Sequence, residues 1–147
     1  MKVSRIFLDA NIFVAAVGRP AGGSGTLLTL CARGFLTAVA SRRVIAEAER
    51  NIREKLGTEA LQKFYELLVG VRPRIVPDPP PRVVRRFARV INKKDAPVLA
   101  AAVHNRADAL VTLDTDFSPP TVHRAAGAVQ ILDPGSVLRL LRRSEES

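Results

Sequence analysis

The sequence lacks the residues that several classes of protein require. Its 147 residues include one cysteine, Cys31, which excludes an intrachain disulfide and a cysteine-based metal cluster. There is no tryptophan and one tyrosine, Tyr65, so the sequence gives little indication that aromatic side chains stack on nucleic-acid bases. No stretch approaches the ~18 consecutive apolar residues of a membrane span. Asp9 interrupts the first apolar run, which therefore predicts a strand and not a signal peptide. We expect a cytoplasmic protein with no membrane association.

Acidic residues are also few, and this makes their positions informative. The chain has 14 acidic and 23 basic side chains, which gives a net charge of +9. A small domain this basic, with arginine dominant, is a candidate for binding nucleic-acid phosphates. The alternative is a solubilising surface rich in arginine. Charge alone does not choose between the two.

Short apolar strands alternate with helices along the chain. This pattern predicts one α/β domain over residues 1–143 with a mostly parallel sheet covered on both faces, followed by a frayed tail at 144–147. A loop rich in glycine is expected at Gly18–Gly25, and a rigid connector at Pro77–Pro81. The predicted strands are Val3–Leu8, Phe35–Ala40, Arg74–Val76, Ala109–Leu113 and Gln130–Leu132. The predicted helices are Asn11–Val17, Thr26–Arg33, 42–56, Glu59–Val69, Arg82–Ile91, Asp95–Arg106 and Ser136–Arg143.

Two acids follow predicted strands directly. Asp9 closes the first strand and Asp114 closes the fourth, with Asp116 two residues later. Ligands of such sheets bind outside the carboxyl ends of the strands. Converging carboxylates repel one another unless a cation such as Mg²⁺ or Mn²⁺ lies between them. Alternatively, each acid caps the next helix, as Asp9 and Asp95 are placed to do.

Four motifs decide between these interpretations, because together they resemble the PIN-domain family, most closely its toxin–antitoxin type. They are LDANIFVAA (Leu8–Ala16), SRRVIAE (Ser41–Glu47), KKDAPVLAAAV (Lys93–Val103) and LVTLDTDF (Leu110–Phe117). The resemblance covers roughly Val3 to Leu132. It implies a three-layer α/β/α fold with a central parallel sheet of four to five strands. It also implies an RNA-cleaving site that holds one or two Mg²⁺ or Mn²⁺.

The resemblance assigns roles to individual residues. It implies that Asp9, Asp95 and Asp114 are metal ligands, and that Glu47 and Asp116 complete the catalytic set. Asn11 and Thr112 match its supporting polar residues. Helical periodicity does not choose Glu47, because Glu49 flanks the same apolar stripe on the other side; Glu49 is therefore the alternative.

The central motif departs from the family pattern. Lys93 and Lys94 precede Asp95, and Pro97 follows it. Proline is compatible with the first turn of a helix. The two lysines either neutralise Asp95 in part or contact a substrate phosphate.

Basic residues supply a candidate substrate surface. Arg82, Arg85, Arg86 and Arg89 recur at three- or four-residue spacing, which predicts one basic face on the Arg82–Ile91 helix, continued by Lys93 and Lys94. The alternative is a solvated helix face. His104 and His123 are expected to be structural or exposed residues and not catalytic ones.

The predicted function is that of a metal-dependent ribonuclease acting as a toxin. The resemblance implies a homodimer and inhibition by a small antitoxin protein, with RNA as the substrate. The apolar faces of the Thr26–Arg33 and Glu59–Val69 helices are candidates for such contacts, although core packing is the expected use. The alternative function is that of a non-catalytic module that binds Mg²⁺ and RNA without cleaving it.

Overall fold

Five parallel strands form the central layer of the molecule, in the order β3-β2-β1-β4-β5. The computed structural model describes residues 2–146. The expected three-layer α/β/α fold with a parallel sheet is confirmed. The strands are β1 (Arg5–Leu8), β2 (Thr37–Ser41), β3 (Arg74–Val76), β4 (Ala109–Val111) and β5 (Gln130–Leu132).

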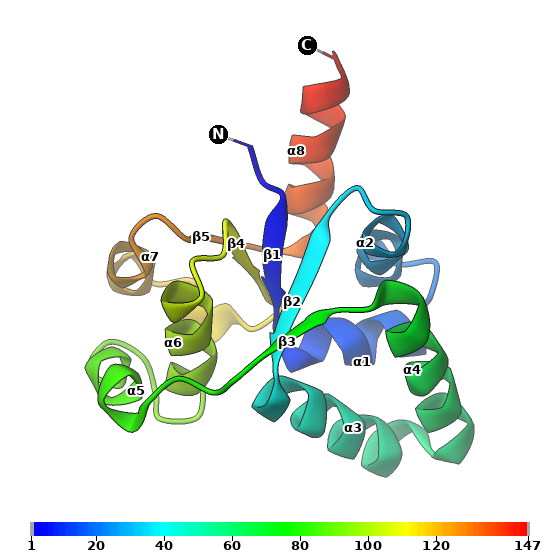
Figure 1. The fold of residues 1–147 in the computed structure, drawn as a ribbon, viewed down its shortest axis with the longest axis horizontal. Coiled ribbons are helices and arrows are strands. Elements are labelled where there is room, and N and C mark those ends of the chain that lie inside the picture. Colours follow the sequence, from blue (N-terminus) through cyan, green and yellow to red (C-terminus); the bar gives the residue numbers. More distant parts are fainter. Residues whose placement is uncertain (1, 147) are drawn as a thin grey trace.

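Helices cover both faces of this sheet (Figure 1). One layer contains α1 (Ala10–Gly18), α2 (Gly23–Ala32), α3 (Arg42–Leu56) and α4 (Thr58–Val71), which pack on one another. The other contains α5 (Pro81–Phe87), α6 (Ala96–His104) and α7 (Pro120–Ala126). A short 3-10 turn, η1 (Thr115–Phe117), follows β4, and the last helix, α8 (Pro134–Glu146), packs against α2. None of the helices in residues 2–146 has the length and apolar character needed to cross a membrane.

The core explains why the central strands are continuous apolar runs. Ile6, Phe7 and Leu8 of β1 have no exposed surface, because helices cover both faces of the strand. On one side the rings of Phe13 and Phe64 meet edge to face at 5.9 Å and join α1 to α4. On the other side, buried alanines at 100–102 let α6 lie close to the sheet.

The order of the strands determines at which edge of the sheet a ligand-binding crevice is expected. The chain runs from β1 outwards to β2 and β3, and then returns to the other side of β1 to form β4 and β5. The topological switch point therefore lies between the carboxyl ends of β1 and β4, where a crevice for ligands is expected. The backbone N–H of Asp9 donates to the carbonyl of Val111 at 3.0 Å, so the segments that follow these two strands begin side by side.

Several boundaries shift by one or two residues, as at the starts of β1 and β2, and some differences have a clear structural reason. The first is the start of α2, which begins at Gly23, inside the segment predicted as a loop. The chain folds back so closely there that a Cβ on Gly25 would lie 2.0 Å from the carbonyl oxygen of Pro20. Only glycine fits this approach, so Gly25 lets the first turn of α2 lie against Pro20.

The second difference is the end of the basic helix. The prediction of a helix over Arg82–Ile91 is wrong, because α5 ends at Phe87. The chain then turns, which buries Ile91 and leaves Arg89 outside the helix. Propensity gave no sign of this end, which tertiary packing of the turn imposes.

The remaining differences lie in the last third of the chain. β4 ends at Val111, two residues earlier than predicted, although the N–H of Thr112 still donates to the carbonyl of Leu132. Neither η1 nor α7 was among the elements predicted from the sequence. Helix α8 runs through the segment 144–146 that was expected to be frayed, while Ser147 lies outside the described residues.

Candidate active site at the carboxyl edge of the sheet

Asp9 is held at the end of β1 by a full set of hydrogen bonds. One carboxylate oxygen, Oδ1, accepts from the backbone N–H of Ala10 at 2.8 Å, so Asp9 also caps α1. The other, Oδ2, accepts from the hydroxyl of Thr112 at 2.7 Å and from the amide of Asn11 at 3.3 Å. Its side chain is 5% exposed.

This burial changes the acidity of Asp9. Burial raises the pKa of its carboxyl to about 6, against the hydrogen bonds from Thr112 and Ala10, which favour the charged form. The negative charges of Glu47 and Asp95 raise the pKa further. Asp9 is thus close enough to both acids for their charges to repel.

Thr112 and Asn11 join the segments that follow β1 and β4. The Thr112 hydroxyl donates to Asp9 and accepts from the backbone N–H of Asp114 at 3.0 Å. Asn11 donates to the same hydroxyl at 3.3 Å, and its Oδ1 accepts from the N–H of Leu113 at 3.1 Å. These bonds fix the position of Asp114 relative to Asp9.

Asp95 is positioned by a residue that the sequence analysis missed. The amide of Asn92 donates to Asp95 Oδ2 at 2.7 Å and to Asp116 Oδ2 at 3.1 Å, while its Oδ1 accepts from the Asp95 N–H at 2.9 Å. Asp95 occupies the N-cap position of α6 but makes no side-chain capping bond. The alternative that it serves as a helix cap is therefore wrong. The Asn-x-x-Asp spacing of 92–95 was the available signal for Asn92.

Three carboxylates from two segments converge beside Asn92. Asp95, Asp114 and Asp116 each offer one carboxylate oxygen, and these oxygens lie within 4.8 Å of one another. Burial raises the pKa of Asp95, and the charges of Asp114 and Asp116 raise it further. The Asn92 hydrogen bond and the charge of Lys94 act in the opposite direction but do not cancel the rise.

The two glutamates of α3 have different surroundings. Glu47 is half-buried, and its charge acts on Asp9. The carboxylate of Glu49 accepts from the Tyr65 hydroxyl of α4 at 2.7 Å and pairs with Arg53 at 3.2 Å. The Tyr65 hydrogen bond is the main reason that the pKa of Glu49 is lowered. This geometry favours Glu47 over Glu49 as a member of the acidic cluster, which consists of Asp9, Glu47, Asp95, Asp114 and Asp116.

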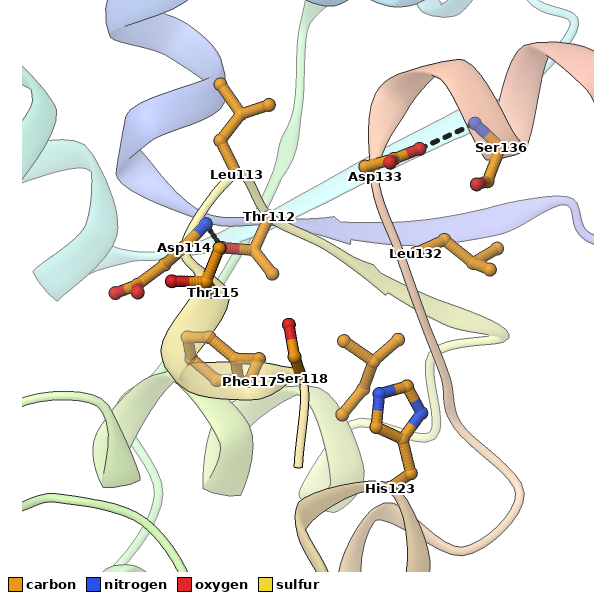
Figure 2. Close-up of a pocket in the computed structure, with 11 residues that line it drawn as sticks. Thr112, Leu113, Asp114, Thr115, Phe117, Ser118, His123, Leu132, Asp133 and Ser136 are labelled. Atoms are coloured by element: carbon orange, nitrogen blue, oxygen red, sulfur yellow. Dashed lines mark hydrogen bonds between the residues drawn. The ribbon is translucent and has the colours of Figure 1, made fainter. Parts of the chain in front are cut away.

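A pocket of about 370 Å³ adjoins Asp114 (Figure 2). Thr112 and Asp114 form one side of it, and His123 of α7 forms another. Asp133 lines the far side, where its carboxylate accepts from the N–H of Ser136 at 2.7 Å. His123 is exposed and contributes to this pocket, which lies next to the acidic cluster.

The predicted basic surface is divided by the early end of α5. Arg82, Arg85 and Arg86 are exposed on α5, with the guanidinium of Arg86 4.9 Å from the centre of the Phe87 ring. Arg89 and Lys93 are exposed in the segment after the helix. The predicted continuous stripe on one helix is therefore wrong in its geometry, although all these cations face solvent.

The donor set fits a hard divalent cation. Five carboxylates, those of Asp9, Glu47, Asp95, Asp114 and Asp116, gather at one edge of the sheet, and their mutual repulsion contributes to the raised pKa of two of them. Mg²⁺ and Mn²⁺ prefer carboxylate oxygens, and such an ion would offset this repulsion. The fold and the site together define a parallel α/β protein with an acidic, metal-competent centre at its switch point.

The sequence matches the PIN domain family over residues 5–116, so this chain belongs to the PIN domain family. The matched region runs from β1 to η1 and contains all five acids. No curated protein matches the sequence.

Solved structures share the fold at low sequence identity. PAE2754 from Pyrobaculum aerophilum has a TM-score of 0.63 at 19% identity, covering 98% of this chain and 91% of its own. VapBC2 from Rickettsia felis, bound to a DNA fragment from its promoter, has a TM-score of 0.62 at 17% identity over 87% and 97% of the two chains. Mycobacterium tuberculosis VapC20, a toxin that cleaves the sarcin–ricin loop, has a TM-score of 0.58 at 18% identity over 83% and 95%.

Proposed function

We propose that this chain is a metal-dependent endoribonuclease that hydrolyses RNA phosphodiester bonds. The observation that carries the proposal is the convergence of Asp95, Asp114 and Asp116, with carboxylate oxygens within 4.8 Å, next to the buried Asp9. Membership of the PIN domain family and the +9 charge of the chain support it. VapC20, with the same fold, is a toxin that cleaves the sarcin–ricin loop.

The residues divide the work of hydrolysis between them. Asp9, Asp95 and Asp114 would hold Mg²⁺ or Mn²⁺, an ion that, when bound, polarises a phosphate oxygen and lowers the pKa of a coordinated water. Glu47 or Asp116 would orient the attacking water in line with the bond to be cleaved. Thr112 and Asn92 would keep the carboxylates in place, as their hydrogen bonds do here.

Substrate would reach this centre across an electropositive surface. The exposed residues Arg85, Arg86, Arg89, Lys93 and Lys94 lie on α5 and on the segment that leads to Asp95. We include them in the proposal as contacts for the RNA backbone away from the bond that is cleaved.

The two glutamates of α3 give a matched test of this function. A labelled single-stranded RNA and an RNA hairpin are incubated with Mn²⁺ and each variant. Glu47→Gln is expected to lose about 100-fold or more in cleavage rate, the range for a positioned acid–base group, whereas Glu49→Gln keeps the parent rate. Equal rates for the two variants would contradict the role of Glu47 in the site and leave Asp116 as the group that orients the water. RNA binding without Mn²⁺-dependent cleavage by the parent would favour the non-catalytic module.

The biological role that fits this activity is that of a toxin held inactive by a small antitoxin protein. The fold is shared with VapBC2, which was solved bound to a DNA fragment from its promoter. We take this likeness as support for an antitoxin partner. A homodimer is part of the same proposal: Val69 of α4 and Phe35 are 75% and 62% exposed and offer apolar surface. Most apolar residues of α2, including Leu27 and Leu28, are instead buried in the core.

Gel filtration tests the partner. The chain is purified alone and with the co-expressed product of a neighbouring gene. A dimer that forms a larger complex with that product, and loses cleavage in it, supports the toxin role. A monomer that forms no complex with the product would rule out the toxin role and leave the nuclease assignment intact.

A further inference from the structure

A second hollow, of about 390 Å³, lies beside the acidic cluster on the α3 side. Its lining consists of Arg43, Ala46, Glu47, Arg50 and Lys94. Three of these five side chains are cationic. Glu47 belongs both to this hollow and to the acidic cluster, because its charge acts on Asp9. The hollow therefore opens directly beside the proposed reaction centre.

The spacing on α3 explains how the cations come together. Arg43 and Arg50 are seven residues apart, close to two full turns, so they project from one face about 10 Å apart along the axis. Ala46 and Glu47 occupy the same face between them, and the small alanine side chain leaves room for the hollow. Lys94, from the segment before α6, closes the group from the other layer of helices.

Within residues 2–146 these three cations form no close ion pair with the neighbouring acids, although the charge of Lys94 acts on Asp95. The ion pair found on α3 in this part of the chain is Arg53–Glu49. Five carboxylates lie close by, yet the cations remain exposed and unpaired. An unpaired group of three cations around a hollow has the charge and the hydrogen-bond donors to bind a phosphate.

We propose that Arg43, Arg50 and Lys94 form a phosphate subsite that binds the RNA backbone next to the phosphate that is cleaved. This inference rests on the proposed function and deepens it by naming where the flanking nucleotide lies. The acidic cluster repels a polyanionic substrate, and a metal ion offsets only part of that charge. Cations on the adjoining wall would hold the chain where repulsion is strongest. The substrate contacts predicted from the sequence lay on the Arg82–Ile91 helix and at Lys93 and Lys94, so of the three subsite residues only Lys94 was among them.

The test measures binding separately from cleavage. A short fluorescein-labelled oligouridylate is titrated with the full chain in EDTA, and its anisotropy gives Kd over a series of salt concentrations. The double variant Arg43→Ala/Arg50→Ala is expected to weaken binding about tenfold or more at low salt, and to reduce the slope of log Kd against log salt by about 0.7 for each phosphate that the arginines no longer neutralise. The variant Arg43→Lys/Arg50→Lys is expected to recover much of the salt dependence but less of the affinity, because lysine lacks the bidentate fork.

A matched control removes the same charge elsewhere. Lys2 and Arg33 are exposed and precede β1 and β2, at the opposite edge of the sheet. At about 0.15 M salt, Lys2→Ala/Arg33→Ala is expected to leave Kd within about twofold of the parent, because interactions beyond about 8 Å are then largely screened, whereas the Arg43/Arg50 variant still binds more weakly. A control that loses as much affinity as the Arg43/Arg50 variant would show a general charge effect and overturn the subsite, as would the absence of binding by the parent.

The outcome separates this inference from the nuclease assignment. If the Arg43/Arg50 variant binds like the parent while the parent cleaves RNA with Mn²⁺, the subsite is wrong and the nuclease stands. If the variant loses binding as expected but the parent never cleaves, the subsite stands and the nuclease is wrong.

Discussion

Replacing Asp9 with asparagine is expected to stabilise the metal-free protein at neutral pH while abolishing activity. The pKa of Asp9 rises from 3.8 to about 6 in the folded state because the side chain is buried beside other acids. Below pH 3.8 the carboxyl is protonated in the folded and in the unfolded protein, so it does not lower the free energy of unfolding. Between 3.8 and about 6 the folded state holds its proton more tightly, so stability falls as pH rises.

The size of the effect follows from the shift. Each pKa unit corresponds to about 1.4 kcal/mol, so ionised Asp9 destabilises the fold by about 3 kcal/mol above pH 6. Asn keeps the shape but not the charge, although its amide suits the donors Thr112 and Asn11 less well. That mismatch costs the same at every pH. The stability difference between Asp9→Asn and the parent should therefore shift in favour of the variant by about 2–3 kcal/mol between about pH 4 and pH 8.

Urea unfolding in EDTA at the two pH values measures this difference. A difference that does not change with pH would refute the reasoning, since it would mean that Asp9 is not held in a charge-repelling site. Added Mn²⁺ at the higher pH should raise the unfolding midpoint of the parent and leave Asp9→Asn unchanged. An equal rise in both proteins would show that Mn²⁺ binding does not require the Asp9 carboxylate.

Three further substitutions, each tested by its own measurement, concern two residues that position the acids and one glycine that the fold requires. Thr112→Val removes the hydroxyl that joins the segments after β1 and β4, and should lower the free energy of unfolding by about 1–3 kcal/mol, with partial recovery in Thr112→Ser. Asn92→Ala should weaken Mn²⁺ binding about 10–100-fold by calorimetry, because Asp95 loses its partner, while the unfolding midpoint changes little at this exposed position. Gly25→Ala should destabilise by about 1–3 kcal/mol or prevent folding, whereas Gly23→Ala, whose added Cβ meets ordinary contacts, should be mild.

The sequence predicts the acids at strand ends well, because their positions depend on local pattern. Asp9 follows three fully buried strand residues, and parallel strands bring their carboxyl ends to one edge. Asp114 was predictable for the same reason, although β4 ends three residues before it and the Thr112 hydroxyl, not the strand, sets its position.

Contacts between elements distant in sequence were beyond prediction. The choice between Glu47 and Glu49 depends on Tyr65 of α4, which holds Glu49 away from the acidic cluster. Helical periodicity contains no information on that partner. The family resemblance favoured Glu47, and in the structure the charge of Glu47 acts on Asp9.

Asn92 was missed for a related reason. Its role depends on the turn after α5, and periodicity extended that helix as far as Ile91. Similarly, Arg43 and Arg50 appear on a helical wheel as solvated residues of α3. Their relation to Lys94 exists only once α6 packs on the other face of the sheet.

The most direct test of the acidic cluster as a hydrolytic centre is the rate of RNA cleavage as a function of Mn²⁺ concentration, for the parent and for Asp114→Asn. Asp114 offers one of the three carboxylates whose oxygens lie within 4.8 Å, so its loss removes a ligand without touching the core. The expected result is no cleavage in EDTA, a rate that saturates with Mn²⁺ in the parent, and a loss of at least about 100-fold in the variant. Cleavage by the parent that persists in EDTA, or an Asp114→Asn variant as fast as the parent, would contradict a metal-dependent nuclease built on these acids.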